Sequence, residues 1–555
     1  MKAVWGIGTL MSVFLQADPV NRQIEDITRY QEQKKIYEEQ TKERQSAKPI
    51  YTPLGKITLQ EDATDSERCI LIETIDLEDI TLIDKKELDT LILPYLHRCN
   101  TMNEINNLVK KINNLYIEKA YITSRAYIKP QDISKGHLVI SAMEGKIESV
   151  AGEGLSTALV FPFIEDNYLN LRDLEVGVEQ LNRLQSMRAT MSINPGSKIG
   201  YSRILMKGEK VGSSLHGSLG VNNYGTSKSG KYQFNASFGW DNPLGINDLL
   251  TINLNTTNKQ DKENNALGDS IHYALPIGRS YLELSYFNFK YNQIVNGLNV
   301  DYLSEGEIET YQAKLEYKLF HTKEQRGKFD LSLLRKKNDN YLAGVYLDSS
   351  SNRLTIMQLA YTHNYIGDDS GGYLTLKYHR GFDWFNAGSG SHAKPVFNKY
   401  TLDMNYNKKL NEAEVPVRYN FSFHGQYAKE GIIGTEQIGI GGPYSVRGFK
   451  NEGQLSGNKG FYIRNELSLH QALSKGSFNP YLALDYGRVS KNEQSYGGYI
   501  IGFAMGTRVN VSGWSLDLFR SLPLKDSNNV TYRPNDDEVY SDNDGFWGFN
   551  LSYRF

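Results

Sequence analysis

Long hydrophobic runs are missing from most of this 555-residue chain. Beyond the first 17 residues, no apolar run approaches the roughly 18 to 20 residues that a membrane-spanning helix needs. The mean hydropathy of the chain is also negative, at -0.50. These absences exclude a membrane protein built from helices.

An excess of charge of one sign is missing as well, because 62 basic and 64 acidic residues leave a net charge of -2. Nucleic-acid binding usually needs a basic face, so we expect no nucleic acid among the partners. The chain also lacks the phosphate-binding Gly-x-x-x-x-Gly-Lys-Ser/Thr motif, the His-Glu-x-x-His motif and a metal-spaced cluster of Cys and His. We therefore predict no catalytic residues, no metal site and no cofactor, and expect that the protein is not an enzyme.

The start of the chain has the pattern of a signal peptide. Lys2 is a short basic start, residues 3–15 form an apolar core, and Ala17 is a small residue before Asp18. This order of features is typical of a secretory signal. We predict a signal peptide at residues 1–17 and export of the mature chain; the alternative is an N-terminal segment that is never cleaved.

Cysteine is nearly absent, since Cys69 and Cys99 are the only two. An exported protein with two cysteines most simply pairs them. Such a disulfide would close a loop of about 30 residues and stabilise a small domain by roughly 3 kcal/mol. The alternative is a pair of buried free thiols.

The segment after the signal peptide is rich in Glu, Gln, Lys and Arg from residue 21 to residue 45. Ile24, Ile27 and Tyr30 form only a short apolar stripe at helical spacing. A mostly polar helix cannot nucleate a hydrophobic core, so this one is either a solvated spacer or lies in a wet cavity. We assign residues 18–48 to the helical segment and residues 49–66 to a linker.

Two small α+β units follow, which we place at residues 67–146 and 147–207. In the first, we expect a strand through Ile70, Ile72 and Ile75, a helix over residues 105–115, and strands at 121–128 and 137–143. In the second, we expect a helix over residues 171–184 and strands at 189–193 and 201–206, with a turn at Pro195-Gly196. Both units have the form of sheet-plus-helix binding modules.

From residue 208 onward, apolar and polar residues alternate with a period of two. The clearest strand sets Tyr311, Ala313, Leu315, Tyr317 and Leu319 against Gln312, Lys314, Glu316 and Lys318. The final strand sets Trp547, Phe549, Leu551, Tyr553 and Phe555 against Gly548, Asn550, Ser552 and Arg554. A soluble sandwich also alternates, but seldom ends on a terminal phenylalanine strand behind a signal peptide. At about 22 residues per strand and connection, residues 208–555 predict a transmembrane antiparallel β-barrel of about 16 strands.

Three groups of motifs follow one another along the chain: residues 121–127, 131–136 and 144–147, then residues 171–175, 182–184 and 195–196, then residues 230–233 and 241–248. Together they resemble motifs of the outer-membrane transporters of two-partner secretion, the TpsB type. The first group is similar to the first periplasmic POTRA domain of that family, the second group to its second POTRA domain, and the third group to the first strands of its barrel. The resemblance covers nearly the whole mature chain and implies that the helix at residues 18–48 is a plug inside the barrel at rest.

The most specific motif is Val446-Arg447-Gly448-Phe449, which matches the tip of the family's sixth extracellular loop, a loop that folds back into the lumen at about residues 440–455. The family's partner motif is Phe-x-Asp-x-Gly on a neighbouring strand; here Asp485 and Gly487 fit, but Ala483 replaces the aromatic residue. Parity independently supports a lumenal Asp485, because Leu482, Leu484 and Tyr486 belong to the lipid-facing set. The resemblance therefore implies a charge-assisted bond between Arg447 and Asp485.

The resemblance implies a pore in the outer membrane of a Gram-negative cell, with both POTRA domains in the periplasm. Its partner would be a large exoprotein with an N-terminal secretion domain: a haemolysin, a haemagglutinin-like adhesin or a contact-dependent growth inhibition toxin. Other expected partners are outer-membrane lipid and lipopolysaccharide, periplasmic chaperones and the barrel-assembly machinery. The alternatives are a barrel-assembly insertase of the same superfamily, a passive porin or nutrient receptor, and a structural adhesin barrel.

Overall fold

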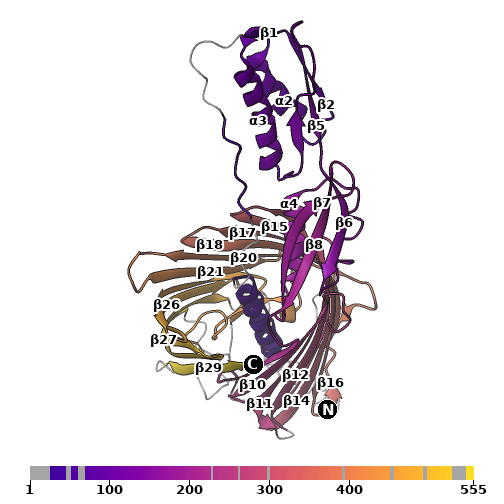
Figure 1. Ribbon diagram of the computed structural model, residues 1–555. Helices are drawn as coiled ribbons and strands as arrows, with labels where there is room; N and C mark the ends of the chain where they lie inside the picture. The colour runs from indigo at the N-terminus through magenta and orange to yellow at the C-terminus, as the bar shows by residue number, and fades with distance from the viewer. Residues whose placement is uncertain are drawn as a thin grey trace.

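In a computed structural model, two small α+β domains stand in line above one mouth of a β-barrel, and a helix lies inside the barrel (Figure 1). The structure describes residues 25–44, 52–59, 69–226, 229–260, 263–296, 300–390, 394–449, 455–491, 497–527 and 545–555. The signal peptide predicted at residues 1–17 lies outside these described residues. None of the helices within them is both long and apolar enough to cross a membrane.

The first small domain packs two helices against short strands. The helices are α2 (Lys85–Ile92) and α3 (Met102–Glu118), with a 3-10 turn η1 (Leu93–Tyr95), and the strands are β1 (Ile70–Ile72), β2 (Thr74–Glu78), β3 (Arg98–Asn100), β4 (Arg125–Tyr127) and β5 (His137–Met143). Thr101 and Glu104 form a capping box that starts α3. Ile105, Leu108 and Ile112 then fall on one helical face and are buried in the core.

The disulfide between Cys69 and Cys99 joins the start of β1 to β3, and the Cα atoms are 5.3 Å apart. Leu71 of β1 lies opposite Cys99 in the antiparallel pair of β1 and β3. This two-stranded sheet is separate from the three-stranded sheet in the order β2-β5-β4. The cross-link therefore closes the outer end of the domain.

The second small domain has one helix, α4 (Leu171–Leu181), on a three-stranded sheet in the order β6-β8-β7. Its strands are β6 (Lys146–Glu153), β7 (Met187–Pro195) and β8 (Tyr201–Lys210). Leu174, Val178 and Leu181 of α4 are buried against the sheet. A hydrogen bond from Arg203 lowers the pKa of Glu148 to about 2 and holds this carboxylate at the turn between β7 and β8.

Three details of the small domains differ from the sequence expectations. The expected strand through Ile70, Ile72 and Ile75 is two strands, because the N–H groups of Glu73 and Thr74 both donate to Gly136 O and interrupt the pairing. The strand expected at residues 121–128 is shortened to β4, since Tyr121 N donates to Tyr116 O in the turn that ends α3. The helix expected over residues 171–184 ends at Leu181, and Leu184 is buried beyond it.

The prediction of a closed antiparallel barrel of sixteen strands is confirmed. Three further segments, β16 (Val345–Tyr346), β19 (Gly388–Ser389) and β25 (Gln471–Leu473), only extend pairings beside longer strands. The sixteen strands of the wall are β9 (Leu215–Asn222), β10 (Gln233–Asp241), β11 (Leu249–Gln260), β12 (Asn265–Ile277), β13 (Ser280–Asn296), β14 (Asp301–His321), β15 (Gln325–Leu342), β17 (Asn352–Ile366), β18 (Ser370–Phe382), β20 (Asn398–Lys409), β21 (Val417–Tyr427), β24 (Lys459–Leu469), β26 (Gly476–Val489), β27 (Gly498–Val511), β28 (Trp514–Asp526) and β29 (Phe546–Arg554). The barrel closes where β29 pairs with β9.

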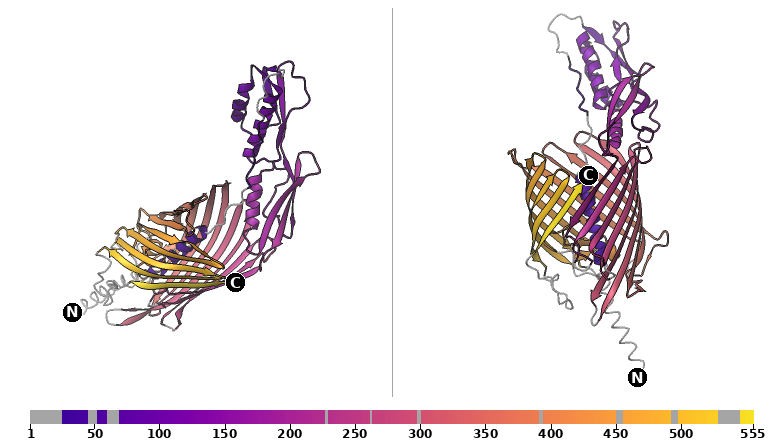
Figure 2. Two further views of the ribbon diagram at one scale, coloured as in Figure 1. Left: turned by 60° about the vertical axis from the view of Figure 1, so that its left-hand side comes forward. Right: turned by 60° about the horizontal axis from the view of Figure 1, so that its bottom comes forward.

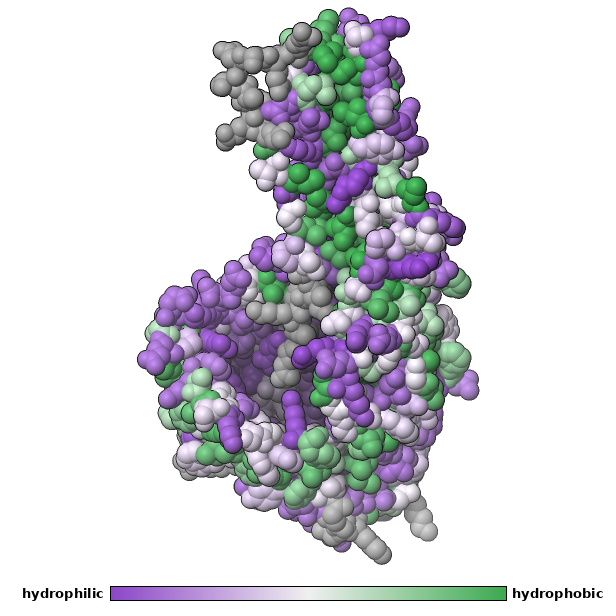
Figure 3. Space-filling view, viewed as in Figure 1, coloured by the Kyte–Doolittle hydropathy of each residue, from purple (hydrophilic) through white to green (hydrophobic). Residues whose placement is uncertain are grey.

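The two faces of the wall have opposite chemistry. On β26, Leu482 and Leu484 are 54% and 49% exposed on the outside, whereas Ala483 and Asp485 are buried inside. An apolar outer face and a polar interior are what a barrel in lipid requires. Figure 3 shows the open mouth of the barrel below the small domains, hollowed and lined largely by hydrophilic residues.

Polar contacts join the second small domain to the rim of the barrel. Arg183 donates to Asn247 O at 2.9 Å, Ser186 N donates to Asp241 at 2.8 Å, and Gln180 donates to Ser280 O at 3.1 Å. Glu179 of α4 also forms an ion pair with Lys318 of β14 at 3.1 Å. These contacts hold the second small domain beside the mouth of the barrel, and the first small domain stands farther out (Figure 2).

Candidate functional site in the barrel lumen

The connection between β21 and β24 folds back into the barrel. It carries a 3-10 turn, η2 (Gly434–Glu436), and a short hairpin of β22 (Ile438–Ile440) and β23 (Leu455–Gly457). Residues 432–448 of this loop are all buried. The loop, which we call the lumenal loop (residues 428–458), thus occupies the interior at the end opposite the small domains; residues 450–454 lie outside the described part.

The predicted motif Val446-Arg447-Gly448-Phe449 lies within this loop and touches the wall along its length. Val446 is fully buried and packs with Ile440 in a cluster that Phe449 covers. A Cβ at Gly487 would come 2.8 Å from Val446, so the glycine makes room for this side chain. Gly448 has φ +106°, a conformation that favours glycine.

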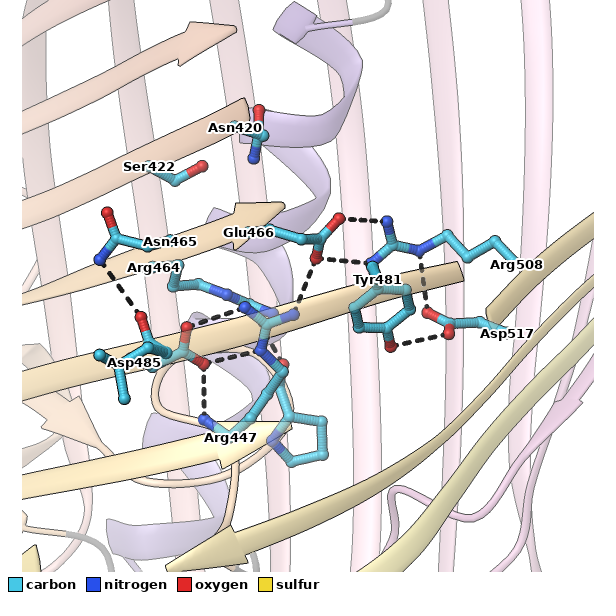
Figure 4. A network of polar contacts seen from close by, with 12 residues as sticks. Asn420, Ser422, Arg447, Arg464, Asn465, Glu466, Tyr481, Asp485, Arg508 and Asp517 are labelled. Atoms are coloured by element: carbon cyan, nitrogen blue, oxygen red, sulfur yellow. Dashed lines mark hydrogen bonds and ion pairs between the residues drawn. The ribbon is translucent and has the colours of Figure 1, made fainter. Parts of the chain in front are cut away.

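Arg447 and Asp485 meet in a three-bond contact (Figure 4). Arg447 Nε and Nη2 donate to the two Asp485 oxygens at 2.7 and 2.8 Å, and the backbone N–H of Arg447 donates to Asp485 Oδ2 at 3.0 Å. The side chains are 4% and 0% exposed. A fork of this kind fixes orientation as well as position, because both carboxylate oxygens are engaged.

The contact continues into a chain of charges across neighbouring strands. Arg447 Nη1 also donates to Glu466 of β24 at 2.9 Å, and Glu466 accepts two bonds from Arg508 of β27 at 2.5 and 2.9 Å. Arg508 then reaches Asp517 of β28 at 3.2 Å. Acidic and basic groups alternate along this chain, so each buried charge has a partner of opposite sign (Figure 4).

The helix of residues 25–44 runs through the lumen beside this loop (Figure 2). Three glutamates at spacings of seven and four lie along it, and each pairs with a lysine of the wall. Glu32 is 3.6 Å from Lys336, Glu39 is 2.8 Å from Lys377, and Glu43 is 2.8 Å from Lys328. A row of ion pairs along one side of the helix therefore binds it to the wall, in addition to the apolar contact of Ile27.

The helix and the lumenal loop also touch each other. Arg29 donates to Gly434 O at 3.1 Å. The ring of Tyr444, two residues before Val446, lies 5.6 Å from Tyr30 and 5.4 Å from Tyr37 of the helix, centroid to centroid. Tyr444 therefore links the helix to the adjoining Val446-Arg447-Gly448-Phe449 motif.

The base of the lumenal loop has an ion-pair contact of its own. Glu436 is buried and lies 2.7 Å from Lys336 and 2.6 Å from Lys399. Lys336 is the same lysine that faces Glu32 of the helix. The loop and the helix therefore share a cation of the wall.

The structure places all the sequence-predicted lumenal residues together, and it adds partners that sequence reasoning did not find. The added residues are Glu466, Arg508, Asp517, Glu436 and the three helix glutamates. Charged residues on the inward parity of β24, β27 and β28 were a visible signal, but their pairing depends on strand register. As a whole, the arrangement fills the lumen with two elements, and ion pairs with the wall add to the apolar packing of each.

Comparison with known proteins identifies the chain's relatives. Residues 200–509 match the family model described as haemolysin secretion/activation protein ShlB/FhaC/HecB. Residues 70–145 match a POTRA domain of ShlB type, and residues 141–195 match a POTRA domain.

Individual relatives agree with these matches. The chain is 30% identical over 498 residues to the outer membrane transporter CdiB of Dickeya dadantii, covering 87% of this chain and 88% of the relative. It is 30% identical over 439 residues to the hemolysin transporter protein ShlB of Serratia marcescens, covering 78% of each. The solved structure of CdiB from Escherichia coli superposes with a TM-score of 0.82 at 26% identity and covers 96% of this chain and 99% of that one.

These matches span both small domains and the barrel, and they confirm the resemblance to two-partner secretion transporters. The two small domains are accordingly called POTRA 1 and POTRA 2 from here on. The chain belongs to the ShlB/FhaC/HecB family, and it is an outer-membrane transporter whose POTRA domains lie in the periplasm.

Proposed function

We propose that this transporter exports one large partner polypeptide, in an unfolded state, from the periplasm to the cell surface. One observation carries the proposal: the lumen leads from the POTRA domains to the far mouth, and it is filled by a helix and a loop that are attached in part by ion pairs. Such contacts can be exchanged for contacts with water when the elements move, because the lumen is polar. A passive porin needs an open channel, whereas this channel holds both a helix and a loop.

The partner belongs to the class of haemolysins, haemagglutinin-like adhesins or contact-dependent growth inhibition toxins. Two relatives at 28% and 30% identity carry the name hemolysin transporter protein, and others carry the name outer membrane transporter CdiB. The POTRA pair captures the N-terminal secretion domain of the partner by adding a strand to an exposed sheet edge. Edge strands are available in both domains, at β2 and β4 in POTRA 1 and at β6 and β7 in POTRA 2.

Capture then displaces the helix of residues 25–44 and opens a path beside the lumenal loop. Folding of the partner outside the cell prevents its return. Outer-membrane lipid and lipopolysaccharide surround the apolar outer face, and periplasmic chaperones and the barrel-assembly machinery bring the barrel into the membrane. Arg447 and Asp485 hold the loop in the position that leaves this path.

Surface export of a large exoprotein of this class, expressed in the same cells as the transporter, tests the proposal. Cells carry the wild type, Arg447→Ala, or a deletion of residues 21–45, and the amount of barrel in the outer membrane is measured in parallel. We expect Arg447→Ala to abolish export while the barrel still inserts. If export persists and general outer-membrane assembly fails instead, the protein is an insertase of the same superfamily and the proposal is wrong.

A further inference from the structure

The segment between the lumenal helix and POTRA 1 is held against the POTRA helices. Its described part, residues 52–59, which we call the strap, has no helix or strand of its own. It runs beside α3 as a thin indigo line in Figure 1. Two sets of hydrogen bonds, which we call the clamps, bind the strap: one from POTRA 2 at Thr52 and one from POTRA 1 at Ile57, five residues later.

The first clamp comes from α4 of POTRA 2. Glu175 Oε1 accepts the backbone N–H of Thr52 at 2.7 Å, and Arg172 Nη1 and Nη2 donate to the Thr52 carbonyl at 3.4 and 3.3 Å. Arg172 and Glu175 are joined to each other at 2.6 Å, and the Glu175 side chain is 0% exposed. A buried carboxylate is costly unless it is satisfied, and here a backbone donor and a guanidinium satisfy it.

The second clamp comes from α3 of POTRA 1. Asn114 Oδ1 accepts the N–H of Ile57 at 2.7 Å, and Asn114 Nδ2 donates to the Ile57 carbonyl at 3.0 Å. One amide side chain thus engages both backbone groups of a single residue, as a neighbouring strand would. Among the described residues, one ion pair involves a strap side chain: Lys56 with Glu118, whose side chains are 67% and 63% exposed, so this pair contributes little.

The two clamps belong to one continuous surface. The N–H of Leu171 at the start of α4 donates to Ala120 O at 3.0 Å, and Asn170 Nδ2 donates to Lys119 O at 3.0 Å, so α3 and α4 meet end to end. Five residues of extended chain span roughly 17 Å. The surface therefore binds an extended backbone at two points, and the charged side chain between them, Lys56, is mostly exposed.

We propose that this α3–α4 surface binds an extended, unfolded segment of the exported polypeptide, and that the strap occupies it in cis when the transporter is at rest. The proposal rests on the proposed function for the identity of the ligand. Hydrogen bonds made mainly to backbone atoms suit a ligand whose sequence varies along its length. Because the strap is tethered, its effective concentration is high, on the order of millimolar, and it excludes a weakly bound segment until it is released.

The site is distinct from the sheet edges named above, because it lies on the helical face of both domains. An incoming segment that displaces the strap also frees the chain that leads to the lumenal helix. Occupation of this surface and removal of the helix are therefore linked through residues 45–51. The link needs no movement of the POTRA domains.

A photo-crosslinking experiment on the detergent-solubilised full-length protein tests the site. The probe is an eight-residue peptide with the strap sequence of residues 52–59 and a benzophenone at its N-terminus. Ile57→Pro removes the N–H that Asn114 accepts and releases the strap, whereas the matched control Ile57→Val keeps it. We expect Ile57→Pro to raise the yield of crosslinks to α3 and α4 at least tenfold over wild type and Ile57→Val.

Three further measurements decide whether the backbone is what the site reads. In the Ile57→Pro protein, adding Asn114→Ala should lower the yield at least tenfold. A probe that keeps Pro53 in place but has its other seven residues in scrambled order should give a crosslinking yield within about threefold of that of the original probe. N-methylation of the probe's sixth residue, which corresponds to Ile57, should abolish binding. Equal yields in wild type and Ile57→Pro, or indifference to Asn114→Ala, would show that the strap is only a tether and overturn the proposal.

The failure of this inference can be told apart from the failure of the proposed function. If wild-type cells export the exoprotein but crosslinking does not respond to Asn114→Ala, the surface is refuted and the export function stands. If wild-type cells export nothing, the export function is refuted, whatever the peptide does.

Discussion

Replacing Arg447 with alanine should undock the lumenal loop. The change removes the two side-chain hydrogen bonds to Asp485 and the one to Glu466, and it leaves Asp485, 1% exposed, without its cationic partner; the backbone N–H of residue 447 remains. Removing one partner of a buried ion pair costs about 3–5 kcal/mol. Since about 1.4 kcal/mol changes an equilibrium tenfold, the undocked fraction of the loop should rise about 100- to 3000-fold.

A thiol placed next to the arginine measures that fraction. Ser445 is fully buried, and both natural cysteines are in the disulfide, so Ser445→Cys supplies a single free thiol. When reclosing is faster than labelling, the rate of maleimide labelling follows the open fraction. We expect Arg447→Ala to raise this rate by at least about two orders of magnitude. The labelling rate of Arg447→Lys should fall between those of the wild type and Arg447→Ala, because lysine keeps the charge but cannot make the two-pronged contact of the guanidinium.

A labelling rate that Arg447→Ala leaves unchanged, in a barrel that still shows heat-modifiable migration, would refute this reasoning. The loop would then be held by the apolar packing of Ile440 and Val446 rather than by its charges. Gly502→Val provides the converse test, because a Cβ at residue 502 would lie 1.5 Å from Arg447 O and must displace the loop while every charge remains. Gly388→Val is its control, since nothing lies within 4 Å of a Cβ there.

The lumenal helix and the disulfide allow two further predictions. Replacing Glu32, Glu39 and Glu43 together with glutamine should raise the open probability of the pore in planar bilayers, because it removes three ion pairs between the helix and the wall, whose side chains are 16–46% exposed. Ion pairs that water reaches contribute up to about 1 kcal/mol each. The wild-type open probability should rise with salt, which shortens the screening length from about 10 Å at 0.1 M to about 3 Å at 1 M, and the triple variant should lose most of this dependence. Replacing Cys69 and Cys99 with serine should lower the unfolding free energy of POTRA 1 by about 3–4 kcal/mol, measured by denaturant titration with a POTRA 1 probe. The heat-modifiable migration of the barrel should not change, and a parallel loss of barrel stability would contradict the assignment of the disulfide to POTRA 1 alone.

Much of the lumenal site could be predicted because its members follow strand parity. Asp485 is two residues from Ala483 and Gly487 on β26, and all three share the inward face that alternation assigns to them. Parity says which face a residue occupies, but not which neighbour it meets. Glu466 and Arg508 lie on strands separated by β26, and their contact depends on the register of two pairings. That information is spread over the whole wall and is not visible in any one strand.

The helix glutamates were open to prediction in a way that Glu466 was not. Spacings of seven and four put Glu32, Glu39 and Glu43 on one helical face, and this local signal is present in the sequence alone. The apolar stripe of Ile24, Ile27 and Tyr30 is the more obvious pattern in this segment, and it does not reveal the row of glutamates. In POTRA 1, by contrast, the break between β1 and β2 depends on Gly136, some sixty residues away, so no local pattern could reveal it.

The helix of residues 25–44 is surrounded by a closed wall of strands. Since β29 and β9 are hydrogen-bonded to each other, the wall is closed around the helix, and movement along the lumen is the route that breaks no strand pairing. A stroke of seven residues, about 10.5 Å, carries Glu32 to the place of Glu39 with almost no rotation, opposite Lys377. Withdrawal of the helix therefore passes through an intermediate position in which Glu32 pairs with Lys377. Single-channel records of the wild type should show this position as an intermediate conductance level, and Glu32→Gln should remove that level.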